Sequence, residues 1–213
     1  GDVDPERLKR WPVVSYMDPH QSRPTAIIWL AVDPMDQAWQ LAELEVSGDA
    51  TGVKAAVDRL EAEREWTVVW RKGDPKITAQ ANQFAKEVNG EPFNIRRAFE
   101  DAGLFFEEAE TNFTVGRQRV LDAMLVNPLT KAPGLRVHRS CPKTHYQMAH
   151  FTWETPAKDG TPRGKDQPGR RHSDFPACLR YFAIDQVEHR QLERVQAPQV
   201  IRAGKWTIGG ARG

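Results

Sequence analysis

Three aspartates in this sequence stand where a carboxylate could bind a metal ion. Asp18 and Asp33 each end an apolar, strand-like run and precede a proline, within VVSYMDPHQSRPTAIIWLAVDPMDQAW. Asp74 follows another such run, in WTVVWRKGDPK. Carboxylate oxygens are the ligands that Mg²⁺ and Mn²⁺ prefer, and two such ions about 4 Å apart can promote hydrolysis of a phosphodiester. The function therefore depends on which aspartates the fold brings together.

Hydrophobic patterns predict the elements that position these aspartates. Residues 13–17 and 25–32 are apolar and rich in β-branched or aromatic side chains, as in buried strands. A third strand is predicted over residues 38–46, because Ala42, Leu44 and Val46 alternate with Glu43 and Glu45, as is typical of a strand with one solvent-exposed face. Residues 49–65 change to a helical period near 3.6, and residues 66–70 form a fourth apolar run. The predicted order is strand, strand, strand, helix, strand.

Strand geometry separates the two Asp-Pro sites. If the first two strands are antiparallel neighbours, the second starts beside Asp18 and carries Asp33 roughly 25 Å away, at about 3.3 Å per residue. The fourth strand then lies parallel to the first through a right-handed crossover, so Asp74 arrives at the Asp18 end of the sheet. We expect Asp18 and Asp74 to meet. Asp33 and Asp36 are better explained by a type I turn, DPMD, that closes a hairpin.

Two converging carboxylates repel each other unless a cation lies between them, and a second ion would need a third carboxylate. Asp174 is the best-placed candidate, because it begins a long amphipathic helix predicted over residues 173–195. Aspartate is also a common helix N-cap, so a purely structural role for Asp174 stays open.

A basic loop precedes Asp174. Residues 158–172 hold five basic side chains against two acids, which suggests a polyanion at one site; a solvated flexible loop is the alternative. The basic residues are Lys158, Arg163, Lys165, Arg170 and Arg171. The dipeptide at positions 159 and 160, Asp-Gly, predicts a hairpin within this loop.

The remaining patterns predict further helices and one more strand. Asp49 or Thr51 would cap the helix over residues 49–65. Helices are also expected at 92–103, 113–127 and 143–153, with a strand at 134–140.

The composition indicates one globular domain. The chain has 213 residues, of which 39% are apolar and 28% charged, and its net charge is only +1. No apolar run approaches the roughly 20 residues that span a bilayer, and the first residues lack the apolar stretch of a signal peptide. The two cysteines, Cys141 and Cys178, favour a reducing setting. We expect a single domain over residues 1–195 and a mobile, Gly-rich tail over 196–213.

The order of these motifs resembles the nuclease domain of the large terminase subunit of tailed bacteriophages, the DNA-packaging motor. The similarity rests on the three-stranded start ending in Asp, on GDPK after the fourth strand and on HSDFPACLRYF. The segments FEDAGL, VGRQRVLDAML and GLRVHRSCPKTHYQMAHFTW also look like that family, so the resemblance covers about residues 12–190. It implies a ribonuclease H-like α/β fold with a mixed sheet, three antiparallel strands followed by parallel strands, flanked by helices.

The resemblance also implies an endonuclease that cuts concatemeric double-stranded DNA with two Mg²⁺ or Mn²⁺ ions. Asp18, Asp74 and Asp174 match the catalytic metal ligands of the family. The chain departs from the family pattern where Ser173 and Ala177 replace acidic residues, and His172 is an alternative ligand or proton shuttle.

DNA phosphates would be bound by the basic loop and by Arg117, with Arg119 as a further candidate, so cleavage should be largely nonspecific in sequence. The implied partners are double-stranded DNA, the ATPase domain of the same subunit, a portal and a small terminase subunit, in the cytoplasm of the bacterial host. The chain has no G-x-x-x-x-G-K-[ST] motif, so we expect an excised nuclease domain without ATP as a cofactor.

Two other functions remain open from the sequence. One is another ribonuclease H-like enzyme, of the junction resolvase or integrase type. The other is a noncatalytic domain that binds DNA or docks on a portal, with its acidic residues serving as caps and turns.

Several other reactive side chains have ordinary interpretations. Cys141, His145 and His150 could suggest zinc, but no C-x-x-C pair or fourth ligand accompanies them. His20 directly follows Asp18-Pro19 and could lie near the metal-binding edge, but it is best interpreted as a surface loop residue. The acidic run formed by Glu107, Glu108 and Glu110 is best interpreted as a solvated loop.

Overall fold

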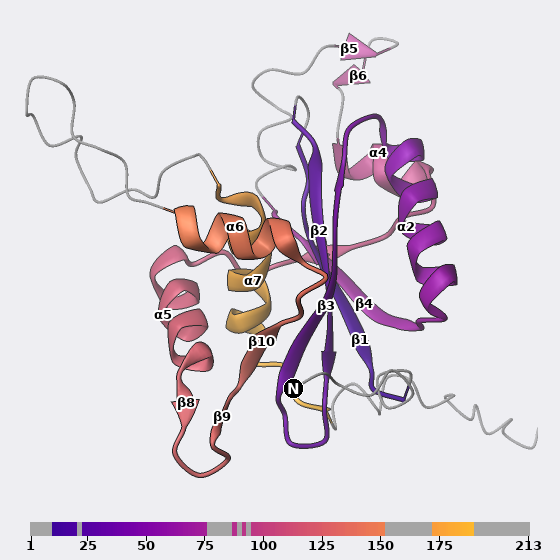
Figure 1. Ribbon diagram of the computed structural model, residues 1–213. Helices are drawn as coiled ribbons and strands as arrows, with labels where there is room; N and C mark the ends of the chain where they lie inside the picture. The colour runs from indigo at the N-terminus through magenta and orange to yellow at the C-terminus, as the bar shows by residue number, and fades with distance from the viewer. Residues whose placement is uncertain are drawn as a thin grey trace, which may run out of the picture.

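Strand β1 (Val13–Asp18) lies near the middle of a six-stranded mixed sheet, as the computed structural model of the chain shows in Figure 1. The structure describes residues 10–20, 23–75, 87–88, 91–92, 95–151 and 172–189. The strand order is β10-β3-β2-β1-β4-β7. The other strands of this sheet are β2 (Thr25–Val32), β3 (Ala38–Val46), β4 (Val68–Gly73), β7 (Glu107–Glu108) and β10 (Leu135–Val137).

The directions of the strands agree with the predicted ribonuclease H-like arrangement. β1, β2 and β3 are consecutive antiparallel neighbours, and β4 pairs with the other edge of β1 in parallel. β7 continues the sheet parallel to β4, and β10 lies parallel to β3. Asp18 pairs with Ala26 at the start of β2, and Met17 pairs with Gly73 at the end of β4. The carboxyl ends of β1 and β4 therefore lie side by side.

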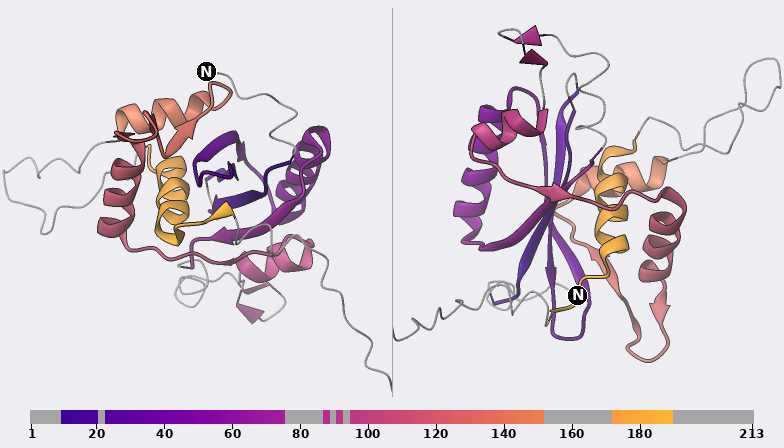
Figure 2. Two further views of the ribbon diagram at one scale, coloured as in Figure 1. Left: turned by 90° about the horizontal axis from the view of Figure 1, so that it is seen from below. Right: turned by 180° about the vertical axis from the view of Figure 1, so that it is seen from behind.

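Five helices cover the two faces of the sheet in the part of the chain that the structure describes (Figure 1; Figure 2). Two of them lie on one face: α2 (Ala50–Arg64) and α4 (Ile95–Asp101). Three lie on the other: α5 (Phe113–Met124), α6 (Pro142–His150) and α7 (Asp174–Asp185). None of these helices is long and apolar enough to cross a membrane.

Two short hairpins stand apart from the main sheet. One pairs β5 (Glu87–Val88) with β6 (Glu91–Pro92), and the other pairs β8 (Val126–Asn127) with β9 (Ala132–Pro133).

Side chains of β1 alternate between two separate cores. Val13 and Met17 pack in the core under α2 and α4, whereas Val14 and Tyr16 pack in the core under α7. Because side chains of a strand change face at every residue, Asp18 continues the series of Val14 and Tyr16. The alternation therefore directs Asp18 toward α7.

The ends of several elements differ from the predictions. β4 starts at Val68 and runs to Gly73, where the apolar pattern suggested 66–70. α7 ends at Asp185 because Gln186 adopts the left-handed conformation with φ of 47°, so one unbroken helix over 173–195 is wrong. α5 ends at Met124 because the next residues form β8, and α6 covers only Pro142–His150.

Of the two aspartates expected to cap helices, Asp49 does so and Asp174 does not. Asp49 caps α2 as predicted, accepting a hydrogen bond from the Gly52 backbone N–H at 2.8 Å. The N-cap of α7 is Ser173, and Asp174 is the first residue of the helix, so the predicted capping role of Asp174 is wrong. Its side chain contacts other residues instead, as described below.

The Glu107 and Glu108 segment is a short strand that pairs with β4, and not the loop that its composition suggested. Both residues are exposed, as expected for an acidic run.

Asp33 closes the β2–β3 hairpin at the opposite end of the sheet from Asp18. Its carbonyl accepts a hydrogen bond from Asp36 N at 2.9 Å, and its Oδ1 accepts from the backbone N–H groups of Met35 and Gln37 at 2.8 and 2.9 Å. Val32 N donates to Pro12 O, which fixes this end beside the start of β1. The predicted turn role of Asp33 is confirmed.

Replacing Gly73 with alanine should destabilise the fold. A Cβ atom at Gly73 would lie 2.9 Å from Phe106 Cδ2 and 3.0 Å from Met17 Cγ, and overpacking of this kind costs about 1–3 kcal/mol. Urea unfolding would measure the loss. Gly52→Ala is the matched control, because its Cβ would meet only Asp49 Oδ1 at 3.4 Å and alanine is favoured in helices by about 0.5–1 kcal/mol. Equal stability of the two variants would contradict the packing argument.

Asp33→Ala should lower the free energy of unfolding by about 1–3 kcal/mol, because the amides of Met35 and Gln37 would lose their acceptor. Asp33→Asn retains a side-chain oxygen and should recover most of this loss. Chemical denaturation of the two variants checks the expectation. An Asp33→Ala protein as stable as the unaltered protein would show that the turn hydrogen bonds are unimportant.

Candidate metal centre

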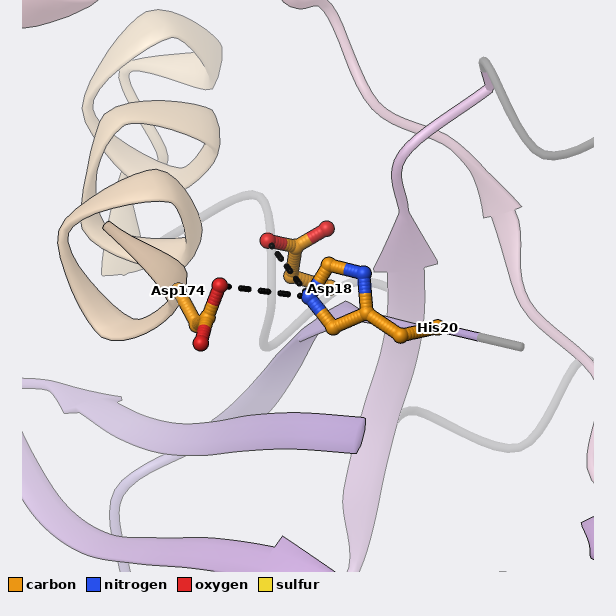
Figure 3. Close-up of side chains that lie close together, drawn as sticks. All are labelled: Asp18, His20 and Asp174. Atoms are coloured by element: carbon orange, nitrogen blue, oxygen red, sulfur yellow. Dashed lines mark hydrogen bonds and ion pairs between the residues drawn. The ribbon is translucent and has the colours of Figure 1, made fainter. Parts of the chain in front are cut away.

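Asp18, His20 and Asp174 meet at the carboxyl end of β1 (Figure 3). His20 Nε2 lies 3.4 Å from Asp18 Oδ2 and 3.2 Å from Asp174 Oδ1. One ligand atom from each residue lies within 4.8 Å of the others. Among the described residues, this is the only group of three or more histidine, cysteine or acidic side chains with a spacing suited to a metal ion.

Helix α7 brings Asp174 to this point because it packs across β1 and β2. Cys178 Sγ, one turn after Asp174, contacts Ala26 O at 3.7 Å, and Ala26 pairs with Asp18. The start of the helix is held by Phe175 N, which donates to Gln147 Oε1 at 2.9 Å. Since the helix starts beside the end of β1, Asp174 and Asp18 lie close together although they are far apart in sequence.

Asp74 joins the same end of the sheet from β4. Its backbone N–H donates to Met17 O at 3.3 Å, which places Asp74 beside the end of β1. Tyr181 of α7 donates its hydroxyl to Asp74 Oδ2 at 2.9 Å. The structure thus brings Asp18 and Asp74 to one end of the sheet, as the strand count predicted, and leaves Asp33 at the other end. The start of α7 adds Asp174 to the Asp18 end.

Burial dominates the electrostatics of Asp18. Asp18 is only 8% exposed, and this burial raises the pKa of its carboxyl. Contact with His20 acts in the opposite direction, while the charges of Asp74 and Asp174 raise the pKa further. The site therefore concentrates negative charge where solvent compensates it poorly.

Two basic side chains offset part of this charge. Burial acts to lower the pKa of His20, but its hydrogen bonds with Asp174 and Asp18 raise it to about 9. Burial acts to raise the pKa of Asp174, but His20 and Arg23 outweigh it and the pKa is lowered. Arg23 Nη1 lies 3.2 Å from Asp174 Oδ1. A protonated His20 thus pairs with both carboxylates, whereas Arg23 pairs with Asp174.

His172, the alternative ligand, lies among aromatic rings. Its ring centroid is 5.2 Å from that of Tyr146 and 6.0 Å from that of His150. His172 does not belong to the Asp18, His20 and Asp174 group.

The two arginines of α5 that were predicted to contact DNA occupy different surroundings. Arg117 borders a cavity of about 220 Å³ between α5, α6 and α7, together with Phe151, Pro176 and Arg180. Arg119 donates to Ile184 O at the end of α7, which gives it a structural contact. The basic residues of the loop, Lys158, Arg163, Lys165, Arg170 and Arg171, lie outside the described residues, as does the tail over 196–213.

Sequence reasoning gave His20 the wrong preferred interpretation and missed Tyr181. The interpretation of His20 as a surface loop residue is wrong, because its side chain is 16% exposed and lies between two carboxylates. His20 lies two residues after Asp18, just past the end of β1. In a strand, residues two apart point to the same face, so this spacing could have indicated that the two side chains lie together. Tyr181 lies seven residues after Asp174, which places both on one face of a helix. That spacing could have identified it.

Both cysteines are buried among other side chains. Cys141 and Cys178 are free and buried, and burial raises the pKa of Cys141 to about 12 and that of Cys178 well above its ordinary value. Cys141 Sγ contacts Gln40 O, and His145 contacts His138 O. These residues form no zinc group in the described part of the chain.

No family model and no curated protein matches the sequence. Solved structures match the fold. The large terminase from the thermophilic bacteriophage D6E matches with a TM-score of 0.58 and 12% sequence identity, over 82% of this chain and 39% of that chain. The P22 large terminase nuclease domain matches with a TM-score of 0.56 and 13% identity, over 86% of this chain and 87% of that domain.

The chain therefore spans about two fifths of the D6E protein but nearly all of the P22 domain. At 12–13% identity the likeness is one of fold. It confirms the predicted mixed α/β architecture and the resemblance noted in the sequence: this chain has the fold of a phage large terminase nuclease domain.

Proposed function

We propose that this chain is a metal-dependent endonuclease that cuts concatemeric double-stranded DNA during the packaging of a viral genome. The observation that carries the proposal is the group formed by Asp18, His20 and Asp174 at the end of β1. Asp74 lies outside this group, but β4 brings it to the same end of the sheet. The fold shared with the P22 large terminase nuclease domain supports the proposal, because that domain is a nuclease.

The donor set fits divalent metal ions. Asp18 and Asp174 offer carboxylate oxygens, which suit Mg²⁺ and Mn²⁺, and Asp74 offers a further carboxylate at the same end of the sheet. His20 would add an imidazole nitrogen after giving up the proton that its raised pKa retains. The raised pKa of Asp18 shows that burial and neighbouring acids disfavour its charged form, and a bound cation would relieve this cost. We propose the three aspartates as catalytic metal ligands for two ions, with His20 as the histidine ligand in preference to His172.

Metal ions held by these residues would activate a water molecule and stabilise the leaving oxygen of the phosphodiester. The chain itself supplies the orientation of the ligands. Asp18 and Asp74 are fixed by adjacent parallel strands, and Asp174 by the first turn of α7. Basic side chains would bind the phosphates and position the DNA without reading its sequence. We assign this contact to Arg117 and to the loop residues Lys158, Arg163, Lys165, Arg170 and Arg171.

The resemblance noted in the sequence implies the proposed partners, and the D6E match agrees with it in that this fold covers only part of a longer large terminase. We propose double-stranded DNA as the substrate, and an ATPase domain, a portal and a small terminase subunit as the other packaging components, in the cytoplasm of a bacterial host.

Plasmid cleavage tests the proposed activity. The purified protein should nick and linearise supercoiled plasmid at low salt with Mn²⁺ or Mg²⁺, and chelation with EDTA should stop the reaction. Asp18→Asn, Asp74→Asn and Asp174→Asn should each reduce the rate by at least about 100-fold, because each removes a metal ligand. Gel analysis of plasmid forms over time measures the rates.

Asp33→Asn is the matched control, since it also removes a carboxylate charge but at the far end of the sheet. It should cleave at the rate of the unaltered protein. An unaltered protein that leaves plasmid intact with either metal would refute the nuclease proposal. It would favour a noncatalytic DNA-binding domain if the protein still shifts DNA in a gel.

DNA binding should depend strongly on salt and weakly on sequence. Each phosphate contact adds about one to the slope of log affinity against log salt concentration, so Arg170→Ala combined with Arg171→Ala should reduce this slope by about two. Fluorescence anisotropy with two unrelated duplexes measures it. Lys54→Ala is the control, because Lys54 pairs with Asp58 on α2, which covers the face of the sheet opposite α7. An unchanged slope in the double variant would exclude these arginines from the DNA contact.

A further inference from the structure

A buried tyrosine, Tyr181, contacts the carboxylate of Asp74, the first residue after β4. Tyr181 donates its hydroxyl to Asp74 Oδ2 at 2.9 Å, and Tyr181 is only 4% exposed. Asp74 is the first residue after β4, so the strand fixes its backbone but leaves the direction of its side chain to contacts such as this one. Carboxylates that bind metal ions are commonly held in orientation by such a hydrogen bond.

Helix α7 couples this contact to the other side of the site. Asp174 and Tyr181 lie seven residues apart on α7, on one face and about 10 Å apart along the axis. The same helix therefore supplies one carboxylate and orients another. At its other end, Asp185 pairs with Lys72 of β4 at 2.9 Å, which ties α7 to the strand that precedes Asp74.

We propose that Tyr181 is a positioning residue that holds the Asp74 carboxylate in the orientation needed to bind a divalent metal ion. The inference rests on the proposed function of the aspartates and adds to it a residue outside the ligand set. Because the ring is buried in the core under α7, Tyr181 acts through Asp74 and makes no contact with a DNA strand.

The chain contains its own matched control for this hydrogen bond. Tyr16 is also buried, and it donates its hydroxyl to a carboxylate of α7, Asp185 Oδ2, at 2.5 Å. Asp185 is neutralised by Lys72 and lies at the opposite end of α7 from Asp174. Removing either hydroxyl deletes one buried hydrogen bond to an acid, but only Tyr181 touches a proposed metal ligand.

The test compares Tyr181→Phe with Tyr16→Phe in the whole chain. Binding of Mn²⁺ is measured directly by electron paramagnetic resonance of the free ion, and plasmid cleavage is measured over a range of Mn²⁺ concentrations. Tyr181→Phe should weaken Mn²⁺ binding about 10-fold and raise the Mn²⁺ concentration for half-maximal cleavage by a similar factor. Saturating Mn²⁺ should restore most of the rate, and the KM for DNA should not change.

Tyr16→Phe should lower the urea midpoint at least as much as Tyr181→Phe, and should bind Mn²⁺ as the unaltered protein does. The inference is overturned if Tyr181→Phe binds Mn²⁺ with unchanged affinity, or if Tyr16→Phe weakens binding equally. The binding measurement separates the two proposals. A protein that binds Mn²⁺ but does not cut DNA refutes the nuclease and still tests Tyr181, whereas a protein that binds no Mn²⁺ refutes both.

Discussion

The parallel pairing of β1 with β4 is the constraint on which the candidate site depends. Consecutive strands readily form antiparallel pairs, but a parallel neighbour requires the chain to return along a crossover, here through α2. That return places the carboxyl ends of two strands next to each other, with Met17 opposite Gly73. Gly73 permits this close approach because Phe106 and Met17 occupy the space that a side chain would need. Without this pairing, Asp18 and Asp74 would have no reason to lie together.

The charge balance of the site follows from the same packing. Three carboxylates gather where α7 and the sheet exclude water, and His20 and Arg23 are the basic side chains that the described structure places against Asp174. Close carboxylates in a partly buried setting oppose folding unless positive charge compensates them. An arrangement of this kind costs stability, and it is more readily explained by a ligand that the acids bind than by a structural need.

Much of the fold could be predicted because its central strands carry local signals. The alternation in β3 and the buried runs in β1 and β2 indicate strands directly, and strand counting then separates Asp18 from Asp33. The failures concern contacts between distant residues. Glu107 and Glu108 form a strand only because β4 offers an edge to pair with. His20 was interpreted as a surface residue because Asp174, which it contacts in the fold, lies 154 residues away in the sequence. The end of α7 depends on the conformation of Gln186, which no periodicity reveals.

The anchoring of α7 has a mechanical consequence. The helix is about 18 Å long, and it is fastened near each end: by Asp174 to His20 and Arg23, and by Asp185 to Tyr16 and Lys72. Sliding the helix along its axis, or rotating it about that axis, would break contacts at both ends at once. The helix and the central strands should therefore move as one rigid body, so Asp18 and Asp174 should keep their relative positions when other parts of the protein move.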